Sequence, residues 1–337
     1  MFPLKQNRFR RQIQLVTLLV AIMFLSGCTS PPTQKVYHVG ILSGTDDFLP
    51  IADGFKAKMT KLGYVEGKNI VYDLRKTNAD PAGEQLAAKK FVDDRVDLIF
   101  TFPTEPSITA RNATRGTNIP VVFAYAGIEG SNLVKSVREP GGNNTGVRFP
   151  GPEQITKRLE ILLDVAPSVK RVWIGYDRNY PNNAPTLAAL RPLALSRGVT
   201  LVEVPAANLE EIRADLEARN SSPDIGMDAI ILMPDIFNHC PEGWGMIRKF
   251  AAEHRVPVGG SFLYTVEQGA VFGNANDLVK VGELAAPQAD KILRGVPAGT
   301  IPVVTPEQEL WINYKRAQEL NLTVSEGLLS RAVEIIR

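Results

Sequence analysis

Val96-Asp97-Leu98-Ile99-Phe100-Thr101-Phe102 is the stretch of sequence that decides the fold. It is almost continuously apolar, which is typical of a strand buried on both faces of a parallel sheet. The loop Pro103-Thr104-Glu105-Pro106-Ser107 follows and opens a helix. A buried strand that leads into a helix predicts an α/β domain with alternating strands and helices.

The alternation continues on both sides of this strand. Toward the N-terminus we expect strands over residues 36–42 and 70–74, the first followed by an amphipathic helix and the second by a helix over 82–94, and toward the C-terminus a strand over 120–124. The pattern then restarts, with expected helices over 152–165, 184–196 and 209–219 and expected strands over 171–176, 200–204, 229–233 and 257–260. One βα architecture used twice predicts two Rossmann-like lobes with parallel sheets.

The lobes should be joined by a hinge. We expect residues 36–146 plus about 270–300 in lobe 1, and residues 147–269 plus about 301–337 in lobe 2. The glycine-rich stretch Gly141–Gly146 suits the crossover, and the strand plus helix of 270–294 should return to lobe 1. Because ligands of open α/β sheets bind beyond the carboxyl ends of the strands, the cleft between the lobes is the expected binding site.

The N-terminus has the pattern of an export signal. Four basic residues, Lys5 to Arg11, precede an apolar run over 15–25 and then Ser26-Gly27-Cys28, so residues 1–27 are predicted to be a signal peptide. A retained membrane anchor is the alternative, but the run has about half of the roughly 20 residues that a spanning helix needs. Leu25 to Cys28 resembles the bacterial lipobox. That resemblance implies an exported, membrane-anchored lipoprotein with lipid on Cys28 and a tether over 28–35.

The charge of the chain excludes some partners. Removing residues 1–27 takes away four of the 38 basic side chains and none of the 36 acidic ones, which leaves 34 and 36. A formal charge of −2 gives no reason to expect binding to nucleic acid. The cysteines are Cys28 and Cys240, so a lipidated Cys28 leaves no disulfide within the chain.

Catalytic signatures are weak. The sequence has no G-x-G-x-x-G, and the stretch Gly63 to Asn69 has a glycine spacing one residue short of a phosphate loop. His239-Cys240 has no second pair at zinc spacing, and Asp46-Asp47 is better explained as the start of a helix than as an acid–base pair. We therefore expect a protein that is not an enzyme and that binds no cofactor or metal.

Several segments together resemble the ABC transporter substrate-binding family that includes tryptophan- and tyrosine-type uptake lipoproteins. They are Gly54-Phe55-Lys56, Leu62 to Asn69, Val96 to Ile99, Asn112 to Thr114, Ile119 to Phe123, Leu133 to Ser136, Pro140 to Val147, Lys291 to Gly295 and Ile301 to Val303. The resemblance implies a type I periplasmic-binding fold, a hinged cleft, and delivery of a small-molecule ligand to an ABC permease in the membrane. We expect a monomer. A partner of a membrane sensor and a two-lobed extracytoplasmic enzyme are the alternatives.

The cleft positions depart from the family. Tyr125-Ala126-Gly127 stands where the family often has Thr-Asp-Pro, and Ser261-Phe262 where relatives often carry an acidic residue. Pro234-Asp235 matches the family's Pro-Asp pair. These differences leave an amino acid and a neutral or differently arranged molecule as alternative ligands.

The candidate ligand-binding residues are polar and aromatic side chains at strand ends. They are Ser43, Thr45, Asp46, Thr104, Ser107, Tyr125, Tyr176, Asn179, Asp235, Ser261, Asn274 and Asp277. Tyr125, Tyr176 and Phe262 offer apolar walls, the helix start near Ser107 offers donors to an anionic group, and Asp235 offers a carboxylate. The expected ligand is a small polar or zwitterionic organic molecule with an apolar part.

Overall fold

Two β-sheets organise residues 35–337, the part of the chain that this computed structural model describes. The predicted signal peptide and Cys28 lie outside the described residues. The 5-stranded first sheet has the order β2-β1-β3-β4-β5, with β1 (Tyr37–Ser43), β2 (Ile70–Lys76), β3 (Leu98–Phe102), β4 (Val121–Ala126) and β5 (Asn144–Arg148). Its strands pair in parallel, as predicted.

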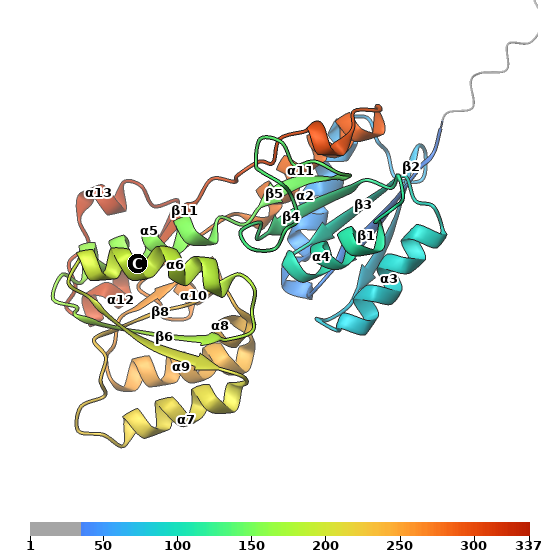
Figure 1. Ribbon diagram of the computed structural model, residues 1–337. Helices are drawn as coiled ribbons and strands as arrows, with labels where there is room; N and C mark the ends of the chain where they lie inside the picture. The colour runs from blue at the N-terminus through green and yellow to red at the C-terminus, as the bar shows by residue number, and fades with distance from the viewer. Residues whose placement is uncertain (1–34) are drawn as a thin grey trace, which may run out of the picture. The chain divides into compact units, whose positions relative to one another are not determined.

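Helices cover both faces of the first sheet (Figure 1). On one face α3 (Pro81–Asp93) and α4 (Thr104–Ala113) bury Phe91 and Ala110 against the sheet. On the other, α2 (Leu49–Lys61) places Phe55 against Phe100 of β3, with ring centroids 3.9 Å apart. Beside it lies α11 (Leu278–Leu293), a helix from much later in the chain. In this structure α11 packs beside α2 on the first sheet.

The second sheet is larger. It has 7 strands in the order β12-β11-β10-β9-β8-β6-β7, with β6 (Arg171–Asp177), β7 (Thr200–Ala206), β8 (Ala229–Ile231), β9 (Val258–Gly260), β10 (Phe272–Ala275), β11 (Glu309–Asn313) and β12 (Glu334–Ile336). Helices α5 (Gly151–Val165) and α6 (Asn183–Ser196) pack on one face, and α7 (Leu209–Asn220) and α9 (Pro241–Glu253) on the other. The α/β architecture predicted for both lobes is thus observed.

Short helices fill the connections. They are η1 (Asp46–Phe48), α8 (Ile236–His239), α10 (Leu263–Glu267), η2 (Ala298–Thr300), α12 (Tyr314–Glu319) and α13 (Glu326–Leu329). Residues Tyr37–Arg337 form one compact unit.

The expected lobe boundaries need correction. The glycine-rich stretch 141–146 leads into β5, which belongs to the first sheet, so the first crossing comes after Arg148. The strand β10 pairs in parallel with β9 in the second sheet, and only the helix after it returns to lobe 1. Residues 301–304 run beside β5, where the Val304 amide donates to the Gly146 carbonyl over 2.9 Å. The second lobe therefore resumes at β11, an antiparallel neighbour of β10.

Candidate functional site

Tyr125 stands at the carboxyl end of β4 in a conformation that is unusual for an aromatic residue. Its φ is +55°, and the pairing of β4 with β5 shifts register between Ala124 and Ala126. A bulge of this kind redirects a side chain, and strained backbone at a strand end is frequent at functional sites. The irregularity turns the Tyr125 ring out of the regular alternation of the strand.

Aromatic rings from both lobes surround Tyr125. Its centroid lies 5.9 Å from that of Phe48, which ends η1, and 5.0 Å from that of Phe149, in the first crossing segment. Phe262, which follows β9 in lobe 2, is 6.5 Å away. Burial raises the pKa of Tyr125 to about 12, so its hydroxyl stays protonated. We call Phe48, Tyr125, Phe149 and Phe262 the aromatic cluster.

Arg158 lies buried next to this cluster, on α5. Its guanidinium donates from Nη1 to the Leu232 carbonyl and from Nη2 to the Asn274 carbonyl, the latter over 2.8 Å. Gly259 of β9 lies beside this side chain, and a Cβ there would be 3.4 Å from Arg158 Cγ and only 2.8 Å from a ring carbon of Phe272. Burial lowers the pKa of Arg158 to about 10, which still leaves it charged at neutral pH.

Several polar atoms near the carboxyl ends of the second sheet are buried without a hydrogen-bond partner among the described residues. They include Arg158 Nε, Ser261 Oγ and His239 Nε2. His239 Nδ1 lies 3.0 Å from the Tyr264 hydroxyl, and burial together with the nearby Arg158 charge lowers the pKa of His239 to about 3. The imidazole is therefore neutral at neutral pH. Buried polar atoms normally have partners, so this group is a candidate ligand contact.

Thr104 makes a polar contact between the two lobes. Thr104 Oγ1, at the start of α4, accepts from the Gly127 amide over 3.0 Å and from Asn182 Nδ2 of lobe 2 over 2.9 Å. Gly127 allows this approach, because a Cβ there would lie 1.9 Å from Asn182 Oδ1. The residue predicted from the loop after β3 thus contacts the opposite lobe.

Asp235 has protein partners on both carboxylate oxygens. Oδ1 accepts from the Phe237 amide and Asn238 Nδ2, and Oδ2 from the Asp177 amide and Asn183 Nδ2, over 2.7–3.1 Å. Burial raises its pKa, against the effect of these hydrogen bonds. Its acceptor sites are occupied, so the geometry favours a role in holding loops rather than in contacting ligand.

Other predicted residues lie apart from the aromatic cluster. The Tyr176 hydroxyl donates to Glu203 over 3.1 Å, Asn179 is exposed, and Asp46 pairs with Lys76 over 3.1 Å. The remaining predicted residues take the following local partners. Ser43 bonds the Thr45 carbonyl, Thr45 precedes η1, Ser107 bonds the Pro103 carbonyl, Asn274 contacts Gln154 and Gln308, and Asp277 caps α11. Of the predicted residues, Tyr125 belongs to the aromatic cluster, and Ser261 and the Asn274 carbonyl lie with the buried polar group around Arg158.

Sequence reasoning missed Arg158, His239 and Asn182. For Arg158 a signal was present, because Ile155, Arg158, Leu159 and Leu162 follow the i, i+3, i+4, i+7 spacing of one helix face. A charged residue on an apolar face is buried when the helix packs. The two residues of the His239-Cys240 pair have different partners. His239 Nδ1 lies beside the Tyr264 hydroxyl, and Cys240 Sγ accepts from the Gly243 amide at the start of α9.

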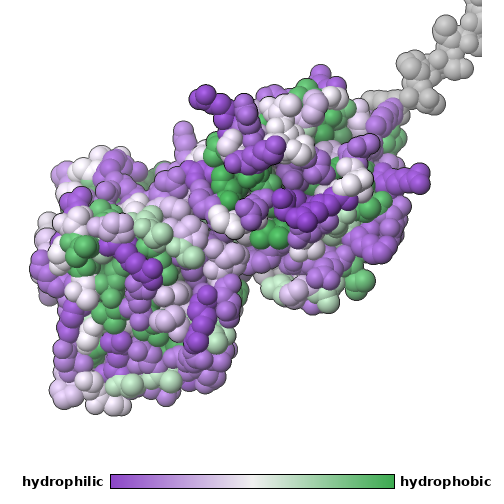
Figure 2. Space-filling view, viewed as in Figure 1, coloured by the Kyte–Doolittle hydropathy of each residue, from purple (hydrophilic) through white to green (hydrophobic). Residues whose placement is uncertain are grey.

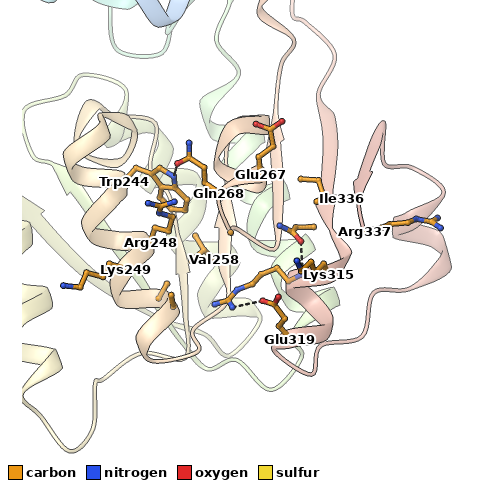
Figure 3. Close-up of a pocket in the computed structure, with 15 residues that line it drawn as sticks. Trp244, Arg248, Lys249, Val258, Glu267, Gln268, Lys315, Glu319, Ile336 and Arg337 are labelled. Atoms are coloured by element: carbon orange, nitrogen blue, oxygen red, sulfur yellow. Dashed lines mark hydrogen bonds and ion pairs between the residues drawn. The ribbon is translucent and has the colours of Figure 1, made fainter.

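A hollow of about 630 Å³ lies at the opposite end of the second sheet (Figure 3). Its lining includes Trp244 and Arg248 of α9, Gln268 before β10, and Arg316 of α12. Trp244 Nε1 donates to Gln268 over 2.8 Å, and Arg316 pairs with Glu319. This hollow shares no residue with the aromatic cluster.

The visible surface is mostly hydrophilic, with apolar residues in scattered groups (Figure 2). Within residues 35–337, no helix combines the length and apolarity that crossing a membrane requires.

Comparison with known proteins agrees with this architecture. Residues 39–336 match the family described as ABC transporter substrate binding protein. The chain belongs to this family. It is therefore a substrate-binding protein of ABC transport, with a small-molecule ligand and an ABC permease as partner, and it works outside the cytoplasm. The family is one of solute-binding proteins, not of enzymes.

Individual relatives support the assignment. The substrate-binding protein described here is 28% identical over 271 residues to a tyrosine-binding protein of Clostridioides difficile, covering 80% of this chain and 76% of the other. A conserved domain protein of Vibrio cholerae has a TM-score of 0.79 at 25% identity, covering 89% of this chain and 100% of the other. A Streptococcus pneumoniae domain in complex with L-Trp has a TM-score of 0.78 at 23% identity, covering 90% of this chain and 100% of the other.

Proposed function

We propose that this substrate-binding protein captures a small organic molecule with an aromatic part, such as an aromatic amino acid, at the aromatic cluster. The observation that carries the proposal is the bulge at Tyr125, whose ring centroid lies 6.5 Å from that of Phe262 in the other lobe. Aromatic pairs prefer offset or edge-to-face arrangements, which a ligand ring can join. A tyrosine-binding relative and an L-Trp complex of similar fold support the same ligand class.

Calorimetric titration with L-tyrosine and L-tryptophan tests the proposal. Phe262→Ala should weaken binding of the ligand by about tenfold or more, because it removes one aromatic wall. The matched control is Leu195→Ala, a large apolar side chain that is 81% exposed on α6. Equal affinities for wild type and Phe262→Ala would place the ligand elsewhere.

The proposed cellular setting is export and lipid attachment at Cys28, with the protein acting as a monomer at the membrane. The support is the lipobox-like Leu25-Ser26-Gly27-Cys28 after a short apolar run. Replacing Cys28 with Ala should release the protein from membranes or block its processing. Fractionation and mass spectrometry of the N-terminus measure this, and an unlipidated wild-type N-terminus would exclude it.

A further inference from the structure

Arg158 is a buried cation without an anion. Only 2% of its surface is exposed, and no Asp or Glu among residues 35–337 pairs with it. Its two hydrogen bonds are to neutral carbonyls, and its Nε–H has no partner in the described part of the chain. Burying an unpaired charge is costly, and proteins usually compensate it with a counter-charge.

The position of the guanidinium follows from the sheet register. Leu232 follows β8 and Asn274 belongs to β10, while β9 lies between these two strands. A side chain that bonds carbonyls on both neighbours therefore crosses the end of β9. Gly259, beside Arg158 Cγ, marks the same crossing.

Ser261 leaves β9 at this point. Gly260 is the partner of Gly273 in the register, so Ser261 stands next to Asn274, whose carbonyl Arg158 binds. Gly259, two residues before Ser261, is on the side of β9 that faces Arg158, because a Cβ at Gly259 would lie 3.4 Å from Arg158 Cγ. Ser261 is 4% exposed, and its hydroxyl is also without a partner among the described residues.

We infer that Arg158 and Ser261 together bind a carboxylate of the transported molecule, an inference that rests on the proposed function for the location of the ligand. A carboxylate accepts hydrogen bonds on both oxygens, so it can take the Nε–H and the Ser261 hydroxyl at once. His239 is neutral, so it adds no second positive charge that would compete with Arg158 for the carboxylate. The aromatic cluster, reached through Tyr125 beside Arg158, then holds the apolar part.

The test compares ligands that differ only in their charged groups, with the wild-type protein in a calorimeter. One series is L-tyrosine and L-tryptophan, with their amines tyramine and tryptamine and their deaminated acids. A second series is L-leucine with its amine and its deaminated acid. We expect each amine to bind at least ten- to a hundredfold more weakly than the matching carboxylate, the effect of one lost charge-assisted hydrogen bond.

Variants then assign the effect to the residues. Arg158→Gln should reduce the preference for acid over amine toward one, Arg158→Lys should retain part of it, and Ser261→Ala should reduce it several-fold. The control is Arg191→Gln, because Arg191 is exposed and bonds Glu203 over 2.7–2.8 Å away from this group. A loss of affinity without a change in the preference would indicate a merely structural role and would overturn the inference.

The outcomes separate the two proposals. If only the leucine series binds with a preference for carboxylates, the aromatic ligand class is wrong and the role of Arg158 stands. If aromatic amines bind as tightly as aromatic acids, the role of Arg158 is wrong and the ligand class stands. If no carboxylate of either series binds more tightly than about 1 mM, both are overturned. Should Arg158→Gln not fold, the wild-type comparison and Ser261→Ala decide.

Discussion

Replacing Asp235 distinguishes a loop-holding carboxylate from a ligand contact. In Asp235→Ala, four donors lose their acceptor: the amides of Asp177 and Phe237 and the side-chain amides of Asn183 and Asn238. Asp235 is 2% exposed, so water reaches these donors poorly. The variant should therefore be destabilised before any effect on ligand is considered.

The magnitude follows from the contacts. A buried donor without a partner costs about 1–3 kcal/mol, so the sum over the four donors is the upper limit of the stability that Asp235→Ala could lose. Removing a buried carboxylate whose pKa is raised recovers part of this, because desolvation of the charge is also removed. We expect a net loss of about 3–5 kcal/mol and a melting temperature lower by roughly 5–15 °C. Asp235→Asn keeps one oxygen and should lie between.

Thermal and chemical denaturation measure this loss, and titration of the folded fraction measures ligand affinity. The control is Asp277→Ala. Asp277 accepts from the amides of Val279 and Lys280 at a helix start and pairs with the exposed Lys280 ammonium, so its loss should cost about 1 kcal/mol. If Asp235→Ala melts like wild type but binds ligand ten- to a hundredfold more weakly, the residue is a ligand contact and the structural reasoning is wrong.

Three further predictions concern pH, packing and closure. Burial raises the pKa of Glu84 from 4.5 to about 7, so the protonated form is favoured on folding and wild-type stability falls as pH rises between these values. Glu84→Gln should thus raise the melting temperature at pH 8 and change it little at pH 4; equal shifts at both pH values would contradict this. Gly259→Ala should destabilise by about 1–3 kcal/mol in denaturant because Phe272 occupies the space, whereas Gly245→Ala, with no atom within 4 Å, should stabilise by about 0.5–1 kcal/mol. Small-angle scattering should show a smaller radius of gyration with saturating ligand, and Gly127→Ala, which displaces Asn182, should reduce this change; no change in wild type would argue against a hinge.

The sequence predicted the regular elements well because their patterns are local. The apolar run before Pro103 became β3, and the helices with apolar faces formed within a few residues of their expected bounds. β5 was missed because Asn144-Thr145-Gly146 carries no apolar alternation, and its burial comes from neighbours on β4 and from residues 301–304. Sheet membership of β10 depends on pairing with β9, which no local pattern specifies.

The site was less predictable for a similar reason. Strand ends indicated Tyr125 and Ser261, but neither the positive φ of Tyr125 nor the missing partner of Ser261 follows from residue type. Asp235 occupies a strand end like the others, yet its donors come from residues up to 58 positions away in the sequence. The sequence alone does not distinguish polar groups that have a hydrogen-bond partner in the fold from polar groups that have none.

The late return of α11 to the first sheet has a kinetic consequence. The chain leaves the ribosome N-terminus first, but Val281, Ala285 and Ala289, which complete the core of lobe 1, follow the whole block from β6 to β10. Contacts between distant segments form slowly, because a long loop must close first. Strands β6 to β10 and their helices are contiguous and need no such closure. The core of the N-terminal lobe, although synthesised first, is therefore completed only after β6 to β10 have been made, and until then the lobe exposes an apolar face to chaperones and proteases.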